Sequence, residues 1–117
     1  MSQSQVVVLG DVGSFDVAEG VRMRALFGDG AMLNQVELDP GATVSLHSHP
    51  HEQLGYVISG EIVMTIDRED QRLGPGAAYV IPGGVEHAGA AGENGCHVLD
   101  VFLPIREDYR ALAEPGA

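Results

Sequence analysis

Hydrophobic and polar residues alternate along much of this chain, and segments rich in glycine and proline separate the alternating stretches. Residues Val21–Phe27 alternate between apolar side chains and two arginines, which predicts a strand with one face in contact with water. Residues Ala31–Leu38 repeat the alternation. The sequence Asp39-Pro40-Gly41 follows and predicts a turn, because proline presets φ and glycine accepts a positive φ.

The same pattern predicts further short strands, each bounded by turn-forming residues. They are Val6–Leu9, Thr43–His49, Gln53–Ser59, Glu61–Asp67, Ala77–Ile81, Val85–Ala91 and Cys96–Leu103. Between the predicted strands we expect loops or turns at residues 10–20, 59–60, 68–71, 73–76, 82–84 and 92–95. Residues Ile105–Ala113 are expected to form a short helical segment on the outside of the sheet.

Nearly ten short strands with no long helix are typical of an all-β sandwich or barrel. The chain has 117 residues, the length of one domain, and we expect residues 1–117 to form a single domain. Its apolar runs are shorter than the roughly 20 residues that span a bilayer. The first residues lack the basic region of a secretory signal, so a cytoplasmic protein is expected.

The formal net charge of the chain is −11, with six arginines and no lysine. Nucleic-acid binding requires a basic surface that displaces counterions, and binding to anionic membranes requires a basic helix. Neither feature is present in the sequence, so neither partner is expected. A small anionic ligand would need positive charge concentrated at its own site, supplied by a metal, by histidines or by an arginine.

Three of the five histidines stand at alternate positions in one short stretch. His47 and His49 should project from the same face of an extended strand, which is half of a metal site. His87, just past a Pro-Gly-Gly turn, is the natural third imidazole, and the amide oxygen of Gln53 could be a fourth ligand. His51 follows a proline that interrupts the strand, so we place it at the mouth of the site.

Nickel, zinc, manganese and iron all accept imidazole ligands, so the identity of one bound divalent ion stays open. Whether His51 or the neighbouring Glu52 joins the site stays open as well. From spacing alone, the alternative is a surface strand on which polar residues happen to alternate.

Two motifs then resemble those of the cupin superfamily. The first, over residues 41–60, consists of Gly41, His47-Ser48-His49, Gln53 and Gly60, separated by five, three and six residues. The second, over residues 76–91, consists of Gly76, Pro82-Gly83-Gly84 and His87, separated by five and two residues. The chain departs from the family pattern at Gln53, where glutamate is usual, and at Ala91, where asparagine is usual.

The resemblance implies a cupin jelly roll whose metal ligands are the matched residues His47, His49, Gln53 and His87, all pointing into the barrel. With glutamine in place of glutamate, a divalent ion and its ligands keep a charge of about +2 rather than about +1. This difference favours an anionic ligand such as a carboxylate or enolate. The resemblance also implies a homodimer, since small cupins commonly pair through sheet edges and the N-terminal strand.

The C-terminal residues Leu99–Phe102, followed by Pro104–Tyr109, narrow the resemblance to the small pectin-degradation cupins. Those cupins convert 4,5-unsaturated uronates into the linear keto-sugar. Asp100, Phe102 and Arg106 match residues assigned to the active site of that group. The resemblance therefore implies a proton-transferring role for Asp100 and a bidentate grip of Arg106 on the substrate carboxylate. The alternatives are a hydrogen-bonded core residue at Asp100 and a surface ion pair of Arg106 with Glu107 or Asp108.

Three functions remain open at this point because all three use the same site. The first is a metal-dependent, isomerase-type enzyme acting on a small anionic sugar. The second is a non-haem iron dioxygenase, since three histidines with open coordination positions also suit oxygen chemistry. The third is a protein that binds a metal or small molecule without turnover.

Overall fold

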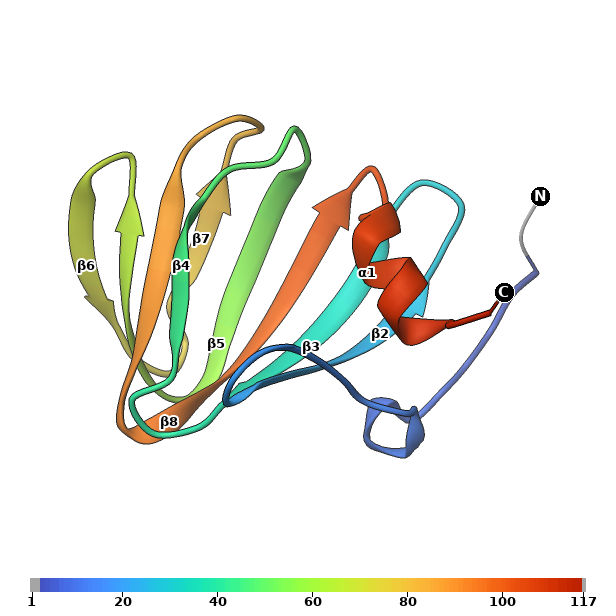
Figure 1. Ribbon diagram of the computed structural model, residues 1–117, viewed down its shortest axis with the longest axis horizontal. Coiled ribbons are helices and arrows are strands. Elements are labelled where there is room, and N and C mark those ends of the chain that lie inside the picture. Colours follow the sequence, from blue (N-terminus) through green and yellow to red (C-terminus); the bar gives the residue numbers. More distant parts are fainter. Residues whose placement is uncertain (1–2, 117) are drawn as a thin grey trace.

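The structure, a computed structural model, describes residues 3–116 of the chain. Nearly all of its regular structure is antiparallel sheet, followed by one short helix (Figure 1). The strands are β1 (Phe15–Ala18), β2 (Val21–Phe27), β3 (Met32–Leu38), β4 (Thr43–His47), β5 (Glu52–Ile66), β6 (Glu69–Leu73), β7 (Ala78–Ile81) and β8 (His87–Leu103). A 3-10 turn, η1 (Leu9–Asp11), precedes them, and the helix α1 (Glu107–Ala113) follows. The all-β prediction with a short C-terminal helix is confirmed.

The two longest strands, β5 and β8, organise the sheet. The strand order is β1-β2-β3-β8-β5-β6, while β4 also pairs with β8 and β7 also pairs with β5. The N-terminal half of β8 lies beside β4 and its C-terminal half lies beside β3, so one strand belongs to both sides of the jelly roll. Figure 1 shows β8 as one ribbon that bends in its middle and carries the chain from one side to the other.

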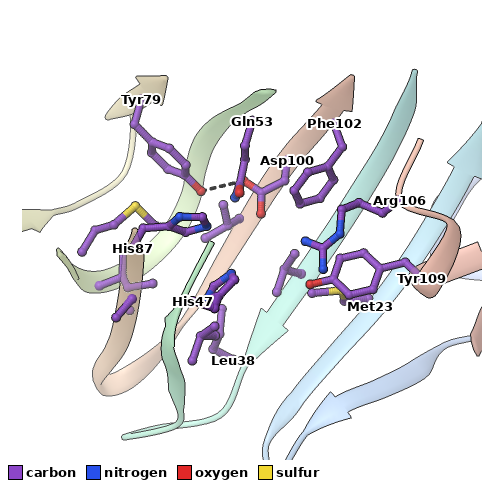
Figure 2. A pocket seen from close by; sticks show the side chains of 17 residues that line it. Met23, Leu38, His47, Gln53, Tyr79, His87, Asp100, Phe102, Arg106 and Tyr109 are labelled. Atoms are coloured by element: carbon purple, nitrogen blue, oxygen red, sulfur yellow. Dashed lines mark hydrogen bonds between the residues drawn. The ribbon is translucent and has the colours of Figure 1, made fainter. Parts of the chain in front are cut away.

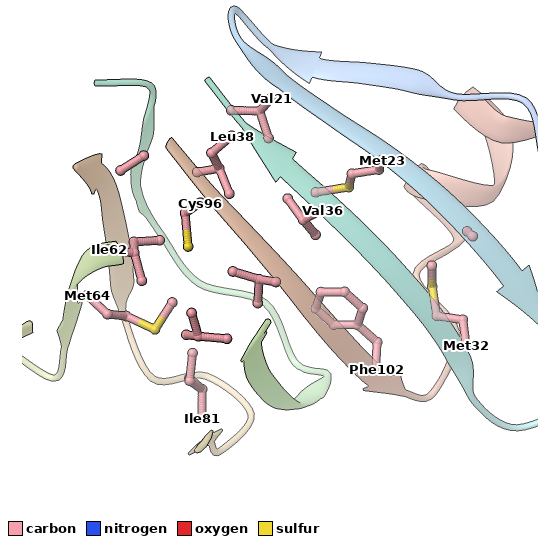
Figure 3. Packing of buried hydrophobic residues seen from close by; sticks show 14 of the residues in the cluster. Val21, Met23, Met32, Val36, Leu38, Ile62, Met64, Ile81, Cys96 and Phe102 are labelled. Atoms are coloured by element: carbon pink, nitrogen blue, oxygen red, sulfur yellow. The ribbon is translucent and has the colours of Figure 1, made fainter. Parts of the chain in front are cut away.

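The core lies between the inner faces of the curved sheet, and period-two alternation places its residues there. On β2 and β3 the burial alternates residue by residue, and on β8 the residues Val98, Asp100 and Phe102 are buried together. Figure 3 shows the apolar side chains that fill the space. Among the most buried are Val21, Met32, Val57, Ile81, Val98 and Phe102.

The prediction for the N-terminal region is wrong. The expected strand at Val6–Leu9 does not form, and Val6 is 99% exposed. The expected loop at residues 10–20 contains β1, where Phe15 is buried opposite Met23. An apolar run forms a strand only where the edge of a neighbouring strand accepts its hydrogen bonds. Among the described residues, β1 is the segment that pairs with the edge of β2.

Two predicted breaks in the sheet are also wrong. Residues 59–60 and 92–95 do not end strands but lie inside β5 and β8. The glycines there accommodate bends instead of reversals: Gly60 and Gly95 both have positive φ, and the register between the two strands shifts beside Gly60. The expected charged turn at residues 68–71 is tighter than predicted, because Asp67 and Arg68 form a two-residue hairpin loop with positive φ.

Replacing Gly60 by alanine is expected to destabilise the fold by about 3 kcal/mol. A methyl group at Gly60 would overlap the carbonyl oxygen of Gly95 and approach Cys96 Cα to 2.9 Å, and the backbone φ of +77° disfavours any side chain. Thermal or denaturant unfolding measures the loss. Gly74→Ala is the matched control, because no atom lies within 4 Å of its added methyl. Equal stability of the two variants would contradict the prediction.

The helix α1 closes one end of the jelly roll. It packs against β1 and β2, and the ring of Tyr109 lies 6.2 Å from the ring of Phe15 and 5.8 Å from that of Phe102. This contact holds the residues around the start of α1, including Arg106, over the inner face of β8. No helix among residues 3–116 is long and apolar enough to cross a membrane.

Candidate metal centre

The structure brings His47, His49 and His87 together at the inner side of the sheet. One ring nitrogen of each lies within 4.8 Å of those of the other two. His47 and His87 are direct cross-strand partners on β4 and β8, and their ring centroids are 4.2 Å apart. His49 and His87 are buried, with centroids 4.9 Å apart. Such a cluster of imidazoles could hold a metal ion.

The position of His49 differs from the expected one. The strand predicted for Thr43–His49 ends at His47, and His49 lies in the connection that follows, just before the bend at residues 50–51. Alternation along a strand therefore does not explain why His49 faces the cluster. Gly84 N donates a hydrogen bond to His49 O, which ties this connection to the turn before β8.

Backbone carbonyls set the orientation of all three rings. Each histidine has Nδ1 within hydrogen-bonding distance of a carbonyl oxygen, so in the neutral ring Nδ1 carries the proton and Nε2 presents a lone pair. This arrangement is typical of histidines that bind metal through Nε2. The contacts are His47 Nδ1 to Ser45 O at 2.7 Å, His49 Nδ1 to His51 O at 3.1 Å and His87 Nδ1 to Val85 O at 2.9 Å.

Several acceptor lone pairs in this cluster face no hydrogen-bond donor. A bound cation would satisfy them. His49 Nε2 lies 3.2 Å from Gln53 Oε1, and with Nδ1 protonated both of these atoms are acceptors. The amide nitrogen of Gln53 is engaged with Asp100, which keeps its oxygen toward His49. His87 Nε2 is buried without any hydrogen-bond partner. Burial lowers the pKa of His49 to about 4, so this ring is neutral at pH 7.

In the metal-free protein, His49→Gln is expected to change the pH dependence of unfolding between about pH 6.5 and pH 4. Burial and the positive charge of Arg106 lower the pKa of His49 to about 4, so in that window the unfolded chain binds more protons than the folded one. Its contribution to stability is therefore complete above pH 6.5 and is lost as the pH falls.

Asp100 changes the stability in the opposite direction over much of the same pH range. Its pKa is raised, so there the folded chain binds more protons than the unfolded one. The difference between wild type and His49→Gln isolates the histidine. Thermal unfolding in the presence of a chelator at several pH values measures this difference, and the variant should lose less stability on acidification. Parallel pH profiles would contradict the prediction.

A pocket opens beside the histidines, and Figure 2 shows its polar side chains at opposite ends. Tyr79, Gln53 and Asp100 lie close together, with His87 and His47 near them, while Arg106 and Tyr109 approach from the helix side. The enclosed space, about 60 Å³, is large enough for an ion with water ligands. Apolar residues complete the lining, among them Met23, Val36, Leu38, Ile62, Met64, Val98 and Phe102.

Asp100 is a buried carboxyl group on the inner face of the C-terminal half of β8. Tyr79 donates a hydrogen bond from its hydroxyl to Asp100 Oδ1 at 2.6 Å. Burial raises the pKa of Asp100 to about 6, and hydrogen bonds from Tyr79 and Gln53 oppose part of that rise. A carboxyl group with a pKa near neutrality can both take up and release a proton at physiological pH.

Arg106 is buried beside the pocket, and its fork is already occupied. Its Nε and Nη2 donate to Asp108 at 3.1 and 2.7 Å, and its guanidinium lies 3.9 Å from the centroid of Tyr109. The expectation that Arg106 offers a bidentate grip to a substrate is therefore not met in this structure. The ion pair with Asp108 exists, although the arginine is buried and not on the surface. Nη1 remains buried without a partner.

The other predicted residues are placed as follows. Phe102 lines the pocket opposite Gln53 on the adjacent strand, and its ring lies 5.6 Å from that of His49. His51 lies outside the three-histidine cluster and contributes its carbonyl oxygen to orient His49. Glu52 is exposed.

Sequence reasoning missed two pocket residues, Tyr79 and Tyr109. Tyr79 stands on a strand whose inward face was not assigned, and its contact with Asp100 joins two residues 21 positions apart in the chain. Tyr109 had a usable signal: it follows Arg106 by three residues in the segment predicted to be helical, which places both on one side.

Comparisons with known proteins agree with this architecture. The chain is 28% identical over 96 residues to the pectin degradation protein KdgF of Dickeya dadantii, covering 80% of this chain and 87% of that protein. The solved structure of KdgF from Halomonas sp. superposes with a TM-score of 0.85 at 30% identity, covering 92% of this chain and 99% of that one. An RmlC-like cupin from Shewanella frigidimarina superposes equally well, with a TM-score of 0.85 at 27% identity, covering 92% and 96%.

The family model described as "Cupin domain" matches residues 34–102, which is more than half of the chain. The matched region runs from β3 to the end of β8 and includes the three histidines, Gln53 and Asp100. The two motifs noted in the sequence both lie inside it. This chain therefore belongs to the cupin family and, within that family, resembles KdgF.

Proposed function

We propose that this protein is a divalent-metal-dependent enzyme that opens the ring of a 4,5-unsaturated uronate. One observation carries the proposal: imidazoles whose Nδ1 atoms face backbone carbonyls, which leaves Nε2 for a metal, share a pocket with the buried carboxyl group of Asp100. The metal ligands in this proposal are His47, His49, His87 and the amide oxygen of Gln53.

These residues provide a neutral set of donors for a cation. A divalent ion bound there would act as a Lewis acid that polarises an oxygen of the substrate. Because Gln53 carries no charge, the donors leave the positive charge of the ion uncompensated. That charge favours an anionic substrate, in a protein whose overall charge of −11 would otherwise repel it.

Asp100 would move the proton that ring opening requires. The anomeric hydroxyl gives its proton to Asp100 as the bond between the anomeric carbon and the ring oxygen breaks, which forms an aldehyde. The ring oxygen becomes an enolate, and Asp100 returns the same proton to the far carbon of the enolate double bond, which gives a ketone. One group that takes a proton and then returns one matches a carboxyl group whose pKa is raised to about 6.

Arg106 would hold the substrate carboxylate through Nη1, the nitrogen that Asp108 leaves without a partner. The similarity to KdgF supports the substrate class, because pectin is a polymer of uronate and that relative is described as a pectin degradation protein. The substrate carboxylate and the reacting hydroxyl would then be held from opposite ends of the pocket.

The direct test follows the ultraviolet absorbance of an unsaturated uronate mixed with the metal-loaded protein. Loss of absorbance faster than the spontaneous rate, abolished by a chelator and restored by adding metal, supports the proposal. No acceleration by fully metal-loaded protein contradicts it. Oxygen consumption that depends on ferrous iron would favour a dioxygenase, and tight uronate binding without turnover would favour a binding protein.

A homodimer and a cytoplasmic location, both expected from the sequence, stay predictions. Exposed apolar residues on the outer face of the sheet support pairing: Leu54, Tyr56 and Ile58 on β5, Val80 on β7 and Leu103 on β8. Light scattering coupled to size-exclusion chromatography would determine the number of chains in the particle.

A further inference from the structure

Three residues on neighbouring strands stand in one row across the sheet. Gly55 on β5 is the direct partner of Tyr79 on β7 on one side and of Asp100 on β8 on the other. The outer two strands are therefore separated by two strand spacings, about 9.6 Å. Even so, the hydroxyl of Tyr79 reaches Asp100 Oδ1 at 2.6 Å (Figure 2).

The missing side chain of Gly55 makes this contact possible. A Cβ atom built on Gly55 would overlap Cζ, Oη and Cε1 of Tyr79, so the tyrosine ring lies across the backbone of β5. The φ of Gly55 is not among the positive values, so conformational freedom does not explain the glycine. This position requires a residue without a side chain, because the ring of Tyr79 occupies the space where a Cβ would lie.

We propose that Tyr79 is a positioning residue for Asp100, and that glycine at position 55 serves to let Tyr79 cross β5 and reach it. The role in turnover rests on the proposed function, in which Asp100 exchanges protons with the substrate. Tyr79 holds one carboxyl oxygen by a hydrogen bond and so fixes the direction in which the carboxyl group faces the pocket.

The surroundings support a hydrogen-bonding role over simple packing. Burial and the neighbouring Asp100 charge raise the pKa of Tyr79, so its hydroxyl stays protonated and acts as the donor. Asp100 also accepts a hydrogen bond from Gln53, whose oxygen faces His49. Tyr79 therefore stands at the outer end of a chain of contacts that runs through Asp100 and Gln53 to the histidines.

The kinetic test uses Tyr79→Phe, which keeps the ring and removes only the hydroxyl. A hydrogen bond to a charged group contributes enough to predict a fall in kcat of about 10- to 100-fold. We expect KM and metal content to change little, because in the proposed arrangement the hydroxyl contacts neither the substrate nor the metal. An unchanged kcat, or a change confined to KM, would overturn the positioning role.

The second test needs no substrate. The chain has three tyrosines and no tryptophan, so its near-ultraviolet absorbance reports on tyrosine alone. A phenol that donates to a buried carboxylate absorbs at longer wavelength than a solvated one. We expect this shifted component in the wild type, its loss in Tyr79→Phe and in Gly55→Ala, and its retention in Gly74→Ala.

The two tests separate two kinds of failure. If Gly55→Ala leaves the tyrosine spectrum unchanged, the claim about Gly55 is overturned whatever the activity. If the metal-loaded wild type does not act on the uronate, the proposed function fails and the positioning role fails with it, although the shifted tyrosine band would still be seen. Loss of the band together with lower kcat in both variants supports the whole proposal.

Discussion

A His87→Ala variant is expected to lose stoichiometric metal binding, with a dissociation constant at least 100-fold above that of the wild type. Replacing a residue that only orients a ligand typically costs 10- to 100-fold in affinity, and removing a ligand should cost at least as much. His87 has the shortest ring distances to both other histidines, and its Nε2 is buried without a partner. Equilibrium dialysis followed by metal analysis measures the change, and His49→Ala should behave alike.

The matched control is His97→Ala. His97 stands on the same strand as His87, ten residues further on. Their side chains nevertheless point to opposite faces, because bends at the glycines of β8 interrupt the alternation. His97 lies outside the three-histidine cluster and should not affect the metal. Wild-type metal content in His87→Ala, or equal losses in both variants, would contradict the ligand assignment. Circular dichroism of each variant excludes unfolding as the cause.

An Asp100→Asn variant is expected to lose catalytic activity by about 10²- to 10⁴-fold in kcat at saturating metal. Asparagine has nearly the same shape and can still accept the hydrogen bond from Tyr79, but it cannot take up a proton from the substrate. Saturating metal is required because Asp100 also holds the amide of Gln53, so weaker metal binding must not be mistaken for lost chemistry.

The same substitution is expected to stabilise the protein at pH 7. Burial raises the pKa of Asp100 to about 6, so keeping the carboxylate ionised costs up to about 3 kcal/mol of folding free energy. The neutral asparagine avoids that cost. Denaturant unfolding measures the gain, and Asp16→Asn, at an exposed position on β1, is the control with no expected effect on either property. Full turnover by metal-loaded Asp100→Asn would show that Asp100 is not the proton-transferring group.

Much of the fold could be predicted because alternation is a local property. A side chain on a strand faces the core or the water according to its parity, and the burial of β2 and β3 follows the sequence pattern residue by residue. The inward face of Val98, Asp100 and Phe102 on β8 follows from the same rule. The resemblance of the two motifs to those of cupins selected His47, His49, Gln53 and His87, which the structure places close together.

Turn-forming residues did not reveal where strands end. The glycines at positions 60 and 95 look like turns in the sequence, yet they bend β5 and β8 without interrupting them. A glycine permits a positive φ, but whether the chain reverses there depends on which strand lies alongside. The exposed run at Val6 shows the same limit, because an apolar segment forms a strand only where an edge is available.

The sequence by itself determined the all-β class, the inward faces of the regular strands and the residue types of the candidate site. Only the tertiary structure decided how those residues are engaged, as where Tyr79 crosses Gly55 to reach Asp100. The physical reason is that period and motif spacing record relations between near neighbours in the chain. A hydrogen bond across two strand spacings depends on the register of distant strands, and that register is established only when the sheet is assembled.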